Sequence, residues 1–393
     1  MKEYKNKLRL MVSTNAIWAQ SGYSMQAVQF VPEMAKHYHT AMVNFYGQEG
    51  GNFEYKNIKM YPKRQSTWGE DSALFHGKDF KADVVFTLQD IWTLNPQILA
   101  DMSRNNLRWI PIVPIDHEPV PPAIYNRLKL AYRIVTYSKF GYEELKRVGM
   151  HSTYIPHTIE TDLYKPVSRE EKKKIRKNAG IPEDCFLFGM VAANKDNPPR
   201  KSFQEVLDAF KLFSEKHPEA RIYFHTVHNQ QNGFPIVEYA KVLKIADKVI
   251  TCDPEDYLFR IKHEEMPKIY NSMDCLLSPS RNEGFGVPII EAQSCGVPAI
   301  VSDFTAMKDL VIEGETGYKV KPMYKPFSPL LSYVAQPDVQ ELYEKMEAVY
   351  SSDRDKMSEM ARKHVVENYD FNLVWNTKWV PFLQTLEEEI YTK

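Results

Sequence analysis

The sequence predicts an α/β protein built from two units, each with a parallel β-sheet flanked by helices. Short apolar runs alternate with amphipathic stretches along most of the chain, which is the pattern of βαβ units. The alternation is interrupted near residue 160, where a charged stretch that contains Pro166 separates two such series. The length of 393 residues is enough for two or three domains with cores of their own.

In the first series, short apolar runs predict the strands and one longer run predicts a helix. A helix is expected at 24–38, because apolar residues recur there at intervals of three to four. The strands are expected at 8–12, 40–46, 82–88, 108–115, 133–137 and 152–155.

The second series repeats this pattern after a linker at about 160–183. The charged run 169–174 in that linker is expected to be a solvated helix. A helix at 202–216 should lie between the first two strands of the second unit. The strands are expected at 185–192, 220–226, 249–251, 274–277 and 299–301.

Two C-terminal segments complete the expected architecture. Residues 371–390 form an amphipathic helix whose aromatic residues recur at helical spacing, so we expect that stripe to be core. Residues 322–338 contain four prolines and no clear period, so we predict no regular element there and assign them no role.

Composition and charge exclude several classes of protein. The chain has 50 Lys and Arg against 51 Asp and Glu, a net charge of −1, which argues against a body that clamps nucleic acid. Aromatic residues make up 12%, which argues against dominant disorder. No window approaches 18 consecutive apolar residues, and the apolar run at 8–12 is too short for a signal peptide. We expect a cytoplasmic protein with no transmembrane segment.

The four cysteines are not spaced as metal ligands are. We expect them to be buried free thiols, in keeping with a reducing compartment. They are Cys185, Cys252, Cys275 and Cys295. Asp353-Arg354-Asp355 resembles a metal-binding triplet, but its position at a helix start is explained by an N-cap with acids in the first turn.

The segment 278–298 has the features of a candidate ligand-binding site. A strand ends there, a loop with Gly284 and Gly286 follows, and then a helix at about 287–295 is expected. Pro288 suits the first helical turn and Gly296 suits the position just after the helix. A helix N-terminus preceded by glycines binds phosphate well, because unpaired backbone amides and the helix dipole favour an anion.

Two glutamates flank this phosphate position, Glu283 in the loop and Glu291 about one turn inside the helix. Carboxylates repel phosphate but accept hydrogen bonds from hydroxyls. A ligand made of a sugar, a diphosphate and a ribose would satisfy all three groups. The alternative is a capped helix with two incidental glutamates.

Glu283 and Glu291 are separated by seven residues, which include Gly-Phe-Gly. This pattern resembles the hallmark of the retaining glycosyltransferases of the GT4 group. The resemblance implies the GT-B fold, two Rossmann-like domains whose parallel sheets face a central cleft. It implies an acceptor-side domain over 1–162, with a C-terminal helix at about 372–393 packing back on it. It implies a domain that binds the nucleotide sugar over 163–371.

The same resemblance implies roles for the residues of 278–298. Glu283 would contact hydroxyls of the donor sugar, and Glu291 would hold the ribose of the nucleotide. The backbone of the loop and helix start would lie against the sugar and the diphosphate. These donor-binding positions are Gly284, Phe285, Gly286 and Val287.

Three further segments resemble family segments. Arg200 and Lys201 match a basic pair that grips the diphosphate, and a guanidinium and an ammonium are suited to that charge. Gly22 lies in a loop that resembles the one facing the donor phosphate and sugar. His117 matches by type a histidine near the reacting sugar, and the alternative is a loop histidine bonded to a neighbouring carboxylate.

The sequence also departs from the family pattern at two places. Asn194-Lys195 stand where an earlier arginine is frequent, and whether Lys195 replaces a diphosphate-binding arginine is left open. Thr158 stands where a glycine is common, so we assign that loop no ligand.

The predicted function is metal-independent, retaining transfer of a sugar from a nucleotide-diphosphate donor, a UDP- or GDP-sugar, to an acceptor hydroxyl. Arg200, Lys201 and the helix end at 284–287 would stabilise the leaving diphosphate, so no metal or other cofactor is expected. A non-catalytic sugar-nucleotide-binding module and a sugar-nucleotide epimerase of the same fold are the alternatives. The acceptor is unidentified; a nucleic-acid acceptor stays open, but no strongly basic segment indicates one. The oligomeric state is not predicted.

Overall fold

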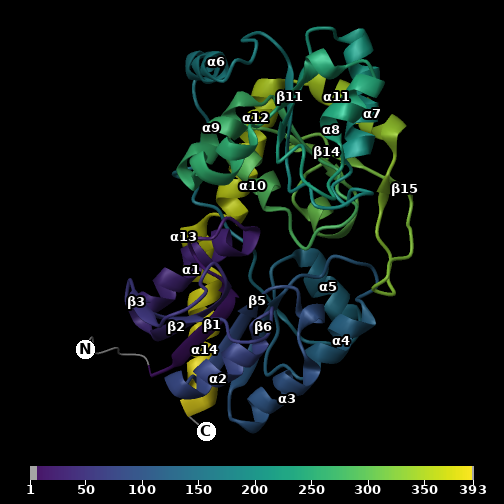
Figure 1. Ribbon diagram of the computed structural model, residues 1–393. Coiled ribbons are helices and arrows are strands. Elements are labelled where there is room, and N and C mark those ends of the chain that lie inside the picture. The colour runs from purple at the N-terminus through teal and green to yellow at the C-terminus, as the bar shows by residue number, and fades with distance from the viewer. Residues whose placement is uncertain (1–6, 392–393) are drawn as a thin grey trace. The chain divides into compact units, whose positions relative to one another are not determined.

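The computed structural model describes residues 7–391 and divides the chain into two compact units (Figure 1). The first unit comprises the residues up to Thr158, Pro329–Ser332 and the chain from Phe371 onward. The second comprises Ile159–Ser328 and Tyr333–Asp370. Among residues 7–391 we find no helix with the length and apolar character that crossing a bilayer requires.

The first unit has an eight-stranded sheet. Its strands are β1 (Arg9–Asn15), β2 (His39–Tyr46), β3 (Phe53–Tyr55), β4 (Ile58–Pro62), β5 (Val84–Leu88), β6 (Arg108–Val113), β7 (Val135–Thr136) and β8 (Thr153–Tyr154). The helices that connect these strands are α1 (Gly22–His37), α2 (Glu70–Phe80), α3 (Pro96–Arg104), α4 (Pro122–Leu128) and α5 (Lys139–Arg147).

The strand order is β3-β4-β2-β1-β5-β6-β7-β8, and every pair is parallel except β3 with β4. From β1 the chain first builds outward through β2 and β4, then returns to add β5 on the other side. Such a reversal of strand order beside the carboxyl ends of the strands is where open α/β sheets bind ligands. The predicted strands are confirmed, whereas β3 and β4 were not predicted; β3 has only three residues, and all of them are exposed.

The C-terminal segment from Phe371 onward belongs to the first unit. The ring of Trp379 lies 5.2 Å from that of Phe30 and 6.1 Å from that of Phe86, so the aromatic stripe is core. The expectation of one continuous helix over 371–390 was wrong. The segment consists of α13 (Phe371–Val374), a π-helical turn (Trp375–Trp379) and α14 (Val380–Tyr391). Pro381 has no N–H to donate to the carbonyl of Thr377, which accounts for the loss of α-helical bonding there.

The second unit has a six-stranded parallel sheet in the order β11-β10-β9-β12-β13-β14. Its strands are β9 (Leu187–Val191), β10 (Arg221–His225), β11 (Val249–Thr251), β12 (Cys275–Ser278), β13 (Ala299–Ser302) and β14 (Gly317–Val320). Its helices are α6 (Arg169–Asn178), α7 (Phe203–Lys216), α8 (Ile236–Val242), α9 (Met266–Ser272), α10 (Val287–Ser294), α11 (Val339–Ser351) and α12 (Arg354–Asn368).

Packing in the second unit agrees with the expected elements in most places. Phenylalanines of β9 and α7 form one buried cluster, and the four cysteines are buried and free, as predicted. The charged run 169–174 lies in the exposed helix α6. Within 322–338, where no element was predicted, β15 (Pro322–Tyr324) and β16 (Gln336–Pro337) form a two-stranded antiparallel ribbon. An isolated ribbon tolerates prolines at its edges, which a central strand does not.

Candidate functional site

The loop between β12 and α10 has the conformation that its glycines and proline predict. Gly286 is the N-cap of α10 with φ of +107°, and Pro288 lies in the first turn. A Cβ at Gly286 would lie 2.7 Å from Ile289 Cδ1, so a larger residue would not fit without rearrangement. Gly296, with φ of +74°, follows the helix end. The helix predicted at 287–295 is therefore confirmed to within one residue.

Backbone and hydroxyl contacts fix this loop to neighbouring segments. The Ser302 hydroxyl donates to the carbonyl of Ser280 at 2.7 Å. The amide of Arg281 donates to the carbonyl of Arg200 at 2.9 Å. The loop after β12 is thus tied to the loop between β9 and α7 by residues 81 positions apart in the chain.

Glu283 lies between the two basic residues that the sequence analysis singled out. The Lys201 ammonium donates to Glu283 Oε1, and Arg200 Nη1 lies 3.5 Å from Glu283 Oε2. The Arg200 guanidinium also donates to the carbonyl of Asn282 at 2.5 Å. The Glu283 side chain is 13% exposed. Two cations therefore surround one largely buried carboxylate beside a helix N-terminus.

The charge state of this group follows from its surroundings. Burial by itself would raise the pKa of the Glu283 carboxyl, but the nearby Lys201 and Arg200 cations lower it to about 2. Burial lowers the pKa of the Lys201 ammonium, and the Glu283 carboxylate opposes that effect. Glu283 is consequently a carboxylate at neutral pH, and the cluster keeps an excess of positive charge.

Glu291 points to a different set of partners. It is 7% exposed, and its Oε2 accepts a hydrogen bond of 2.5 Å from the hydroxyl of the fully buried Tyr270. Burial raises the pKa of the Glu291 carboxyl, although the Tyr270 hydrogen bond works against this. Beside this pair the Tyr164 hydroxyl and His263 Nδ1 are 2.9 Å apart.

Sequence reasoning missed Tyr270, Tyr164 and His263. The rings of Tyr164 and Tyr270 are 6.2 Å apart, and those of Tyr164 and His263 are 5.3 Å apart. Tyr164 comes from the linker before α6, whereas Tyr270 lies on α9. No local spacing signal connects residues that meet only when the unit folds.

Phe285 presents its backbone rather than its side chain as a candidate contact. Its ring is buried and packs edge-on against Tyr369, with centroids 5.8 Å apart. The ring therefore anchors the loop, and the amide beside it stays at the start of α10. The expected backbone role of Gly284, Phe285, Gly286 and Val287 remains a prediction.

The two departures from the family pattern have structural explanations. Asn194 is buried, accepts from the amide of Phe234 at 2.7 Å and donates to the carbonyl of the same residue at 2.9 Å, so it holds two loops together. Lys195 is exposed. Thr158 is held by Gln26 and Gln29, whose side chains bond its backbone and hydroxyl at 2.7 to 3.3 Å.

Two predicted site residues, Gly22 and His117, lie in the first unit, after strands of its sheet. Gly22 opens α1 after β1, and a Cβ there would meet nothing within 4 Å. His117 follows β6 and is buried, and its Nδ1 lies 2.7 Å from Asp116 Oδ1. The alternative interpretation of His117 was a loop histidine bonded to a neighbouring carboxylate, and this bond is present. The other ring nitrogen, Nε2, is the one that could contact a ligand. Gly22 and His117 thus follow strands of the first unit's sheet. All other predicted site residues belong to the second unit.

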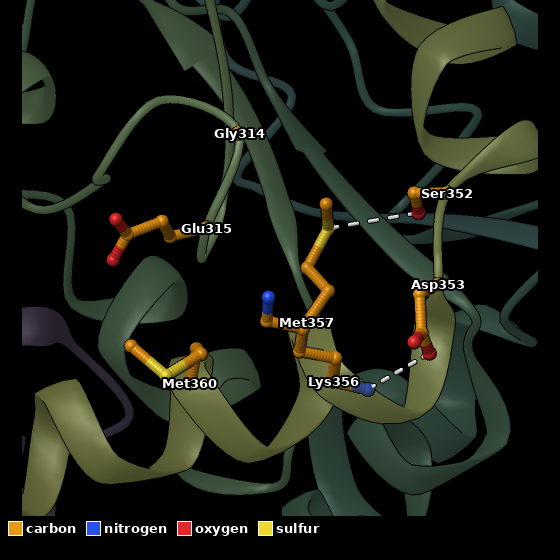
Figure 2. A pocket seen from close by; sticks show the side chains of 7 residues that line it. All are labelled: Gly314, Glu315, Ser352, Asp353, Lys356, Met357 and Met360. Atoms are coloured by element: carbon orange, nitrogen blue, oxygen red, sulfur yellow. Dashed lines mark hydrogen bonds between the residues drawn. The ribbon is translucent and has the colours of Figure 1, made fainter.

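A separate cavity in the second unit has a volume of about 360 Å³ and contains none of the predicted site residues (Figure 2). Asp353 lines it, but this carboxylate accepts from the amide of Lys356 at 3.2 Å and caps α12. The N-cap prediction is confirmed. The seven lining residues are Gly314, Glu315, Ser352, Asp353, Lys356, Met357 and Met360.

The cluster of Glu283, Lys201 and Arg200 lies within a segment that matches a known family. Residues 171–327 match the family described as Glycosyl transferases group 1. The second unit contains a glycosyltransferase group 1 domain. This domain includes Arg200, Lys201, Glu283 and Glu291.

The chain is also similar in sequence to proteins of known function. The chain is 31% identical over 249 residues to the capsular polysaccharide biosynthesis glycosyltransferase CapM of Staphylococcus aureus, covering 63% of this chain and 57% of that protein. It is 29% identical over 165 residues to the mannosylfructose-phosphate synthase of Agrobacterium fabrum, covering 40% of this chain and 33% of that protein. The alignments span between a third and three fifths of these two relatives.

Solved structures show the fold of the chain as a whole. Sucrose-phosphate synthase from Thermosynechococcus elongatus matches with a TM-score of 0.75 at 15% identity, covering 96% of this chain and 99% of that one. HepE of Anabaena in complex with UDP-glucose matches with a TM-score of 0.71 at 13% identity, covering 96% and 100%. The chain has the GT-B fold, an α/β architecture with two parallel-sheet units.

Proposed function

We propose that the protein is a retaining, metal-independent glycosyltransferase that moves a sugar from a UDP- or GDP-sugar to an acceptor hydroxyl. The observation that carries the proposal is the Glu283 carboxylate, held by Lys201 and Arg200 beside the N-terminus of α10 in a group 1 domain. The second unit would bind the nucleotide sugar, and the first would bind the acceptor.

The donor diphosphate would lie against Arg200, Lys201 and the first amides of α10. Two cations against one carboxylate leave an excess positive charge, and the helix dipole adds to it. The donor sugar would place hydroxyls on Glu283, and the ribose would reach Glu291. Because Glu291 already accepts from Tyr270, the ribose would join an existing hydrogen-bonded pair.

The transfer itself would occur on one face of the sugar. The bond between the anomeric carbon and the diphosphate oxygen breaks, and the acceptor oxygen forms its bond on the same face. The acceptor proton passes to the leaving phosphate oxygen, whose charge Arg200, Lys201 and the helix end stabilise. Glu283 is not assigned as a covalent nucleophile, since Lys201 and Arg200 engage both of its oxygens. His117 and Gly22 would act from the first unit, near the reacting sugar and the donor phosphate.

Known proteins support a nucleotide-sugar donor. HepE of Anabaena has been solved with UDP and with UDP-glucose, and its fold is that of this chain. Asn194 and Thr158, the departures from the family pattern that suggested a non-catalytic binding module, each hold segments of the fold together.

The test is to incubate the purified chain with UDP- and GDP-sugars in the presence of EDTA and to measure nucleotide release. Release that is unaffected by EDTA is expected, and it should fall about 100-fold in Arg200→Ala, because this cation would stabilise the leaving group. Arg260→Ala is the matched control, since Arg260 is an exposed arginine of the same unit that pairs with Asp256.

Three outcomes would contradict the proposal. They are a strict dependence on an added divalent metal, nucleotide binding without turnover with every acceptor tried, and conversion of UDP-N-acetylglucosamine alone into a different sugar nucleotide. The last would indicate an epimerase.

A further inference from the structure

Three aromatic side chains form an exposed surface on the first unit, which we call the aromatic platform: Trp18, Phe53 and Tyr55. The Trp18 ring stacks near that of Phe53 with centroids 5.8 Å apart, and it meets Tyr55 edge-on at 6.2 Å. Trp18 is 46% exposed and Phe53 is 42% exposed. Large aromatic rings that gather at the surface of a protein commonly mark a place of recognition.

The platform is held rigidly. The indole Nε1 of Trp18 donates to the carbonyl of Gly47 at 2.8 Å. Gly47 has φ of +91°, and a Cβ there would lie 3.0 Å from Ala16 Cβ. The turn after β2 therefore fits closely against the loop after β1 and fixes the edge of the indole. A ring that is already fixed loses little conformational entropy when a ligand covers its face.

Trp18, which contacts both other rings of the platform, lies at the carboxyl edge of the sheet, because it follows β1. Phe53 pairs with Met60 in the middle of β4, and Tyr55 pairs with Ile58 at the start of that strand. Gly22 and His117 follow β1 and β6 at the same edge. Trp18 is thus at the same edge of the sheet as Gly22 and His117, which the proposed function places near the donor phosphate and the reacting sugar.

A buried amide at this edge lacks partners. Gln89 directly follows β5 and is 2% exposed, yet neither Oε1 nor Nε2 has a hydrogen-bond partner among residues 7–391. A buried amide without partners is costly, and a ligand that both donates and accepts hydrogen bonds would satisfy it. Hydroxyl groups do both.

The charges around the platform are balanced. Glu54 and Lys56 flank Tyr55 in the sequence, and the Lys56 ammonium lies 5.4 Å from the centroid of the Tyr55 ring. Binding to phosphate-rich polymers depends on clustered cations. The surface therefore favours an uncharged ligand over a nucleic acid or an anionic polymer.

We infer that the aromatic platform is a stacking surface for the sugar rings of an uncharged saccharide acceptor, with Trp18 as its fixed centre. The inference rests on the proposed function and names its acceptor class. The C–H face of a sugar ring would cover the aromatic faces, and its hydroxyls would remain in water or reach polar groups at the carboxyl edge.

The experiment is to bind the purified chain to a glycan array that carries neutral, phosphorylated and sulfated saccharides, with the single-stranded DNA dT20 as a separate arm. Retention on neutral saccharides is expected. The affinity should fall at least tenfold in Trp18→Ala and in Phe53→Ala. Trp18→Phe keeps a ring and should retain most of the binding.

Tyr132→Ala is the matched control. Tyr132 is 42% exposed, like Phe53, but it lies near the start of β6 and β7, at the amino edge of the same sheet. Its removal should leave binding unchanged. The melting temperature of each variant shows whether it is folded. Trp18→Phe keeps a ring but loses the bond to Gly47, so it separates the loss of the ring from the loss of that bond.

Retention only on anionic glycans, binding only to dT20, no retention at all, or neutral-glycan binding that survives Trp18→Ala would each overturn the inference. Nucleotide release from UDP-sugars, measured on the same preparations, keeps the two proposals apart. Release without glycan retention overturns only the stacking surface. Glycan retention without release overturns only the proposed transfer reaction.

Discussion

The Lys201 ammonium donates to the Glu283 carboxylate and so connects two loops that are 82 residues apart in the sequence. One loop follows β9 and the other follows β12, and these strands are neighbours in the sheet of the second unit. The carboxyl ends of adjacent parallel strands lie at one edge, so their loops meet there. This ion pair brings together the two motifs that the sequence offered separately.

Replacing Glu283 tests the centre of the site. Glu283→Gln keeps the shape of the side chain but removes its charge, so nucleotide release from a UDP- or GDP-sugar should fall at least about 100-fold. Stability should fall by about 3 kcal/mol, because Lys201 is left without its counter-charge. Glu313→Gln removes a carboxylate that pairs with Lys345 elsewhere in the same unit and should change turnover little. Equal turnover in wild type and Glu283→Gln would contradict the assignment.

The pH dependence of stability follows from the same pair. Folding lowers the pKa of Glu283 from 4.5 to about 2, so the carboxylate stabilises the folded state fully above pH 4.5. That contribution, about 3 kcal/mol from the shift, should disappear as pH falls from 4.5 through 2. Denaturant unfolding of wild type and Glu283→Gln at pH 7, 5, 4 and 3 measures it. A stability difference that stays constant over this range would show that the pair is not coupled to folding.

Gly286→Ala tests the loop conformation. The alanine would need a φ near +107° and would place its Cβ 2.7 Å from Ile289 Cδ1, so we expect a loss of about 2 to 3 kcal/mol. UDP binding should also weaken, since the start of α10 would shift. Gly314→Ala is the control, because Gly314 has φ of +76° with nothing within 4 Å of a Cβ; its cost should be about 1 kcal/mol. Similar melting temperatures for the two variants would argue against a tight fit at Gly286.

Tyr270→Phe tests the support of Glu291. Removing the hydroxyl takes a hydrogen bond from a buried carboxyl whose pKa is already raised, so stability should fall by about 2 kcal/mol. UDP affinity, measured by titration calorimetry, should fall about tenfold as Glu291 loses its orientation. Tyr239→Phe removes a comparable tyrosine hydrogen bond, to Asp208 at 2.7 Å, and should leave UDP affinity unchanged. If Tyr270→Phe binds UDP as wild type does, Glu291 is a structural residue only.

Local signals predicted the loop between β12 and α10 well. Pro288, Gly286 and Gly296 act through the conformations that their own backbones allow, so the end of β12, the loop and the bounds of α10 were readable from neighbouring residues. The strands were readable for a similar reason, since a buried parallel strand is a continuous apolar run. Where the backbone signal was weaker, at β3, β4, β14 and the β15–β16 ribbon, the prediction missed the element.

The side-chain contacts of the site could not be predicted from such local signals. Glu291 with Tyr270, Asn194 with Phe234, and Trp18 with Phe53 are contacts between residues 21 to 40 positions apart, and no periodicity links them. The π-helical turn before Pro381 likewise depends on packing against Phe30 and Phe86 as well as on the proline.

The amino-acid sequence alone determined that this chain forms two α/β units with parallel sheets, and it predicted a glycine-lined helix start with two glutamates as the candidate site of the second unit. Only the tertiary structure decided that Glu283 is held between Lys201 and Arg200, that Glu291 rests on Tyr270, and that three aromatic rings form a surface on the first unit. The reason is physical: backbone preference and apolar spacing are local properties, whereas charge pairing, burial and ring contacts exist only once distant strands lie side by side.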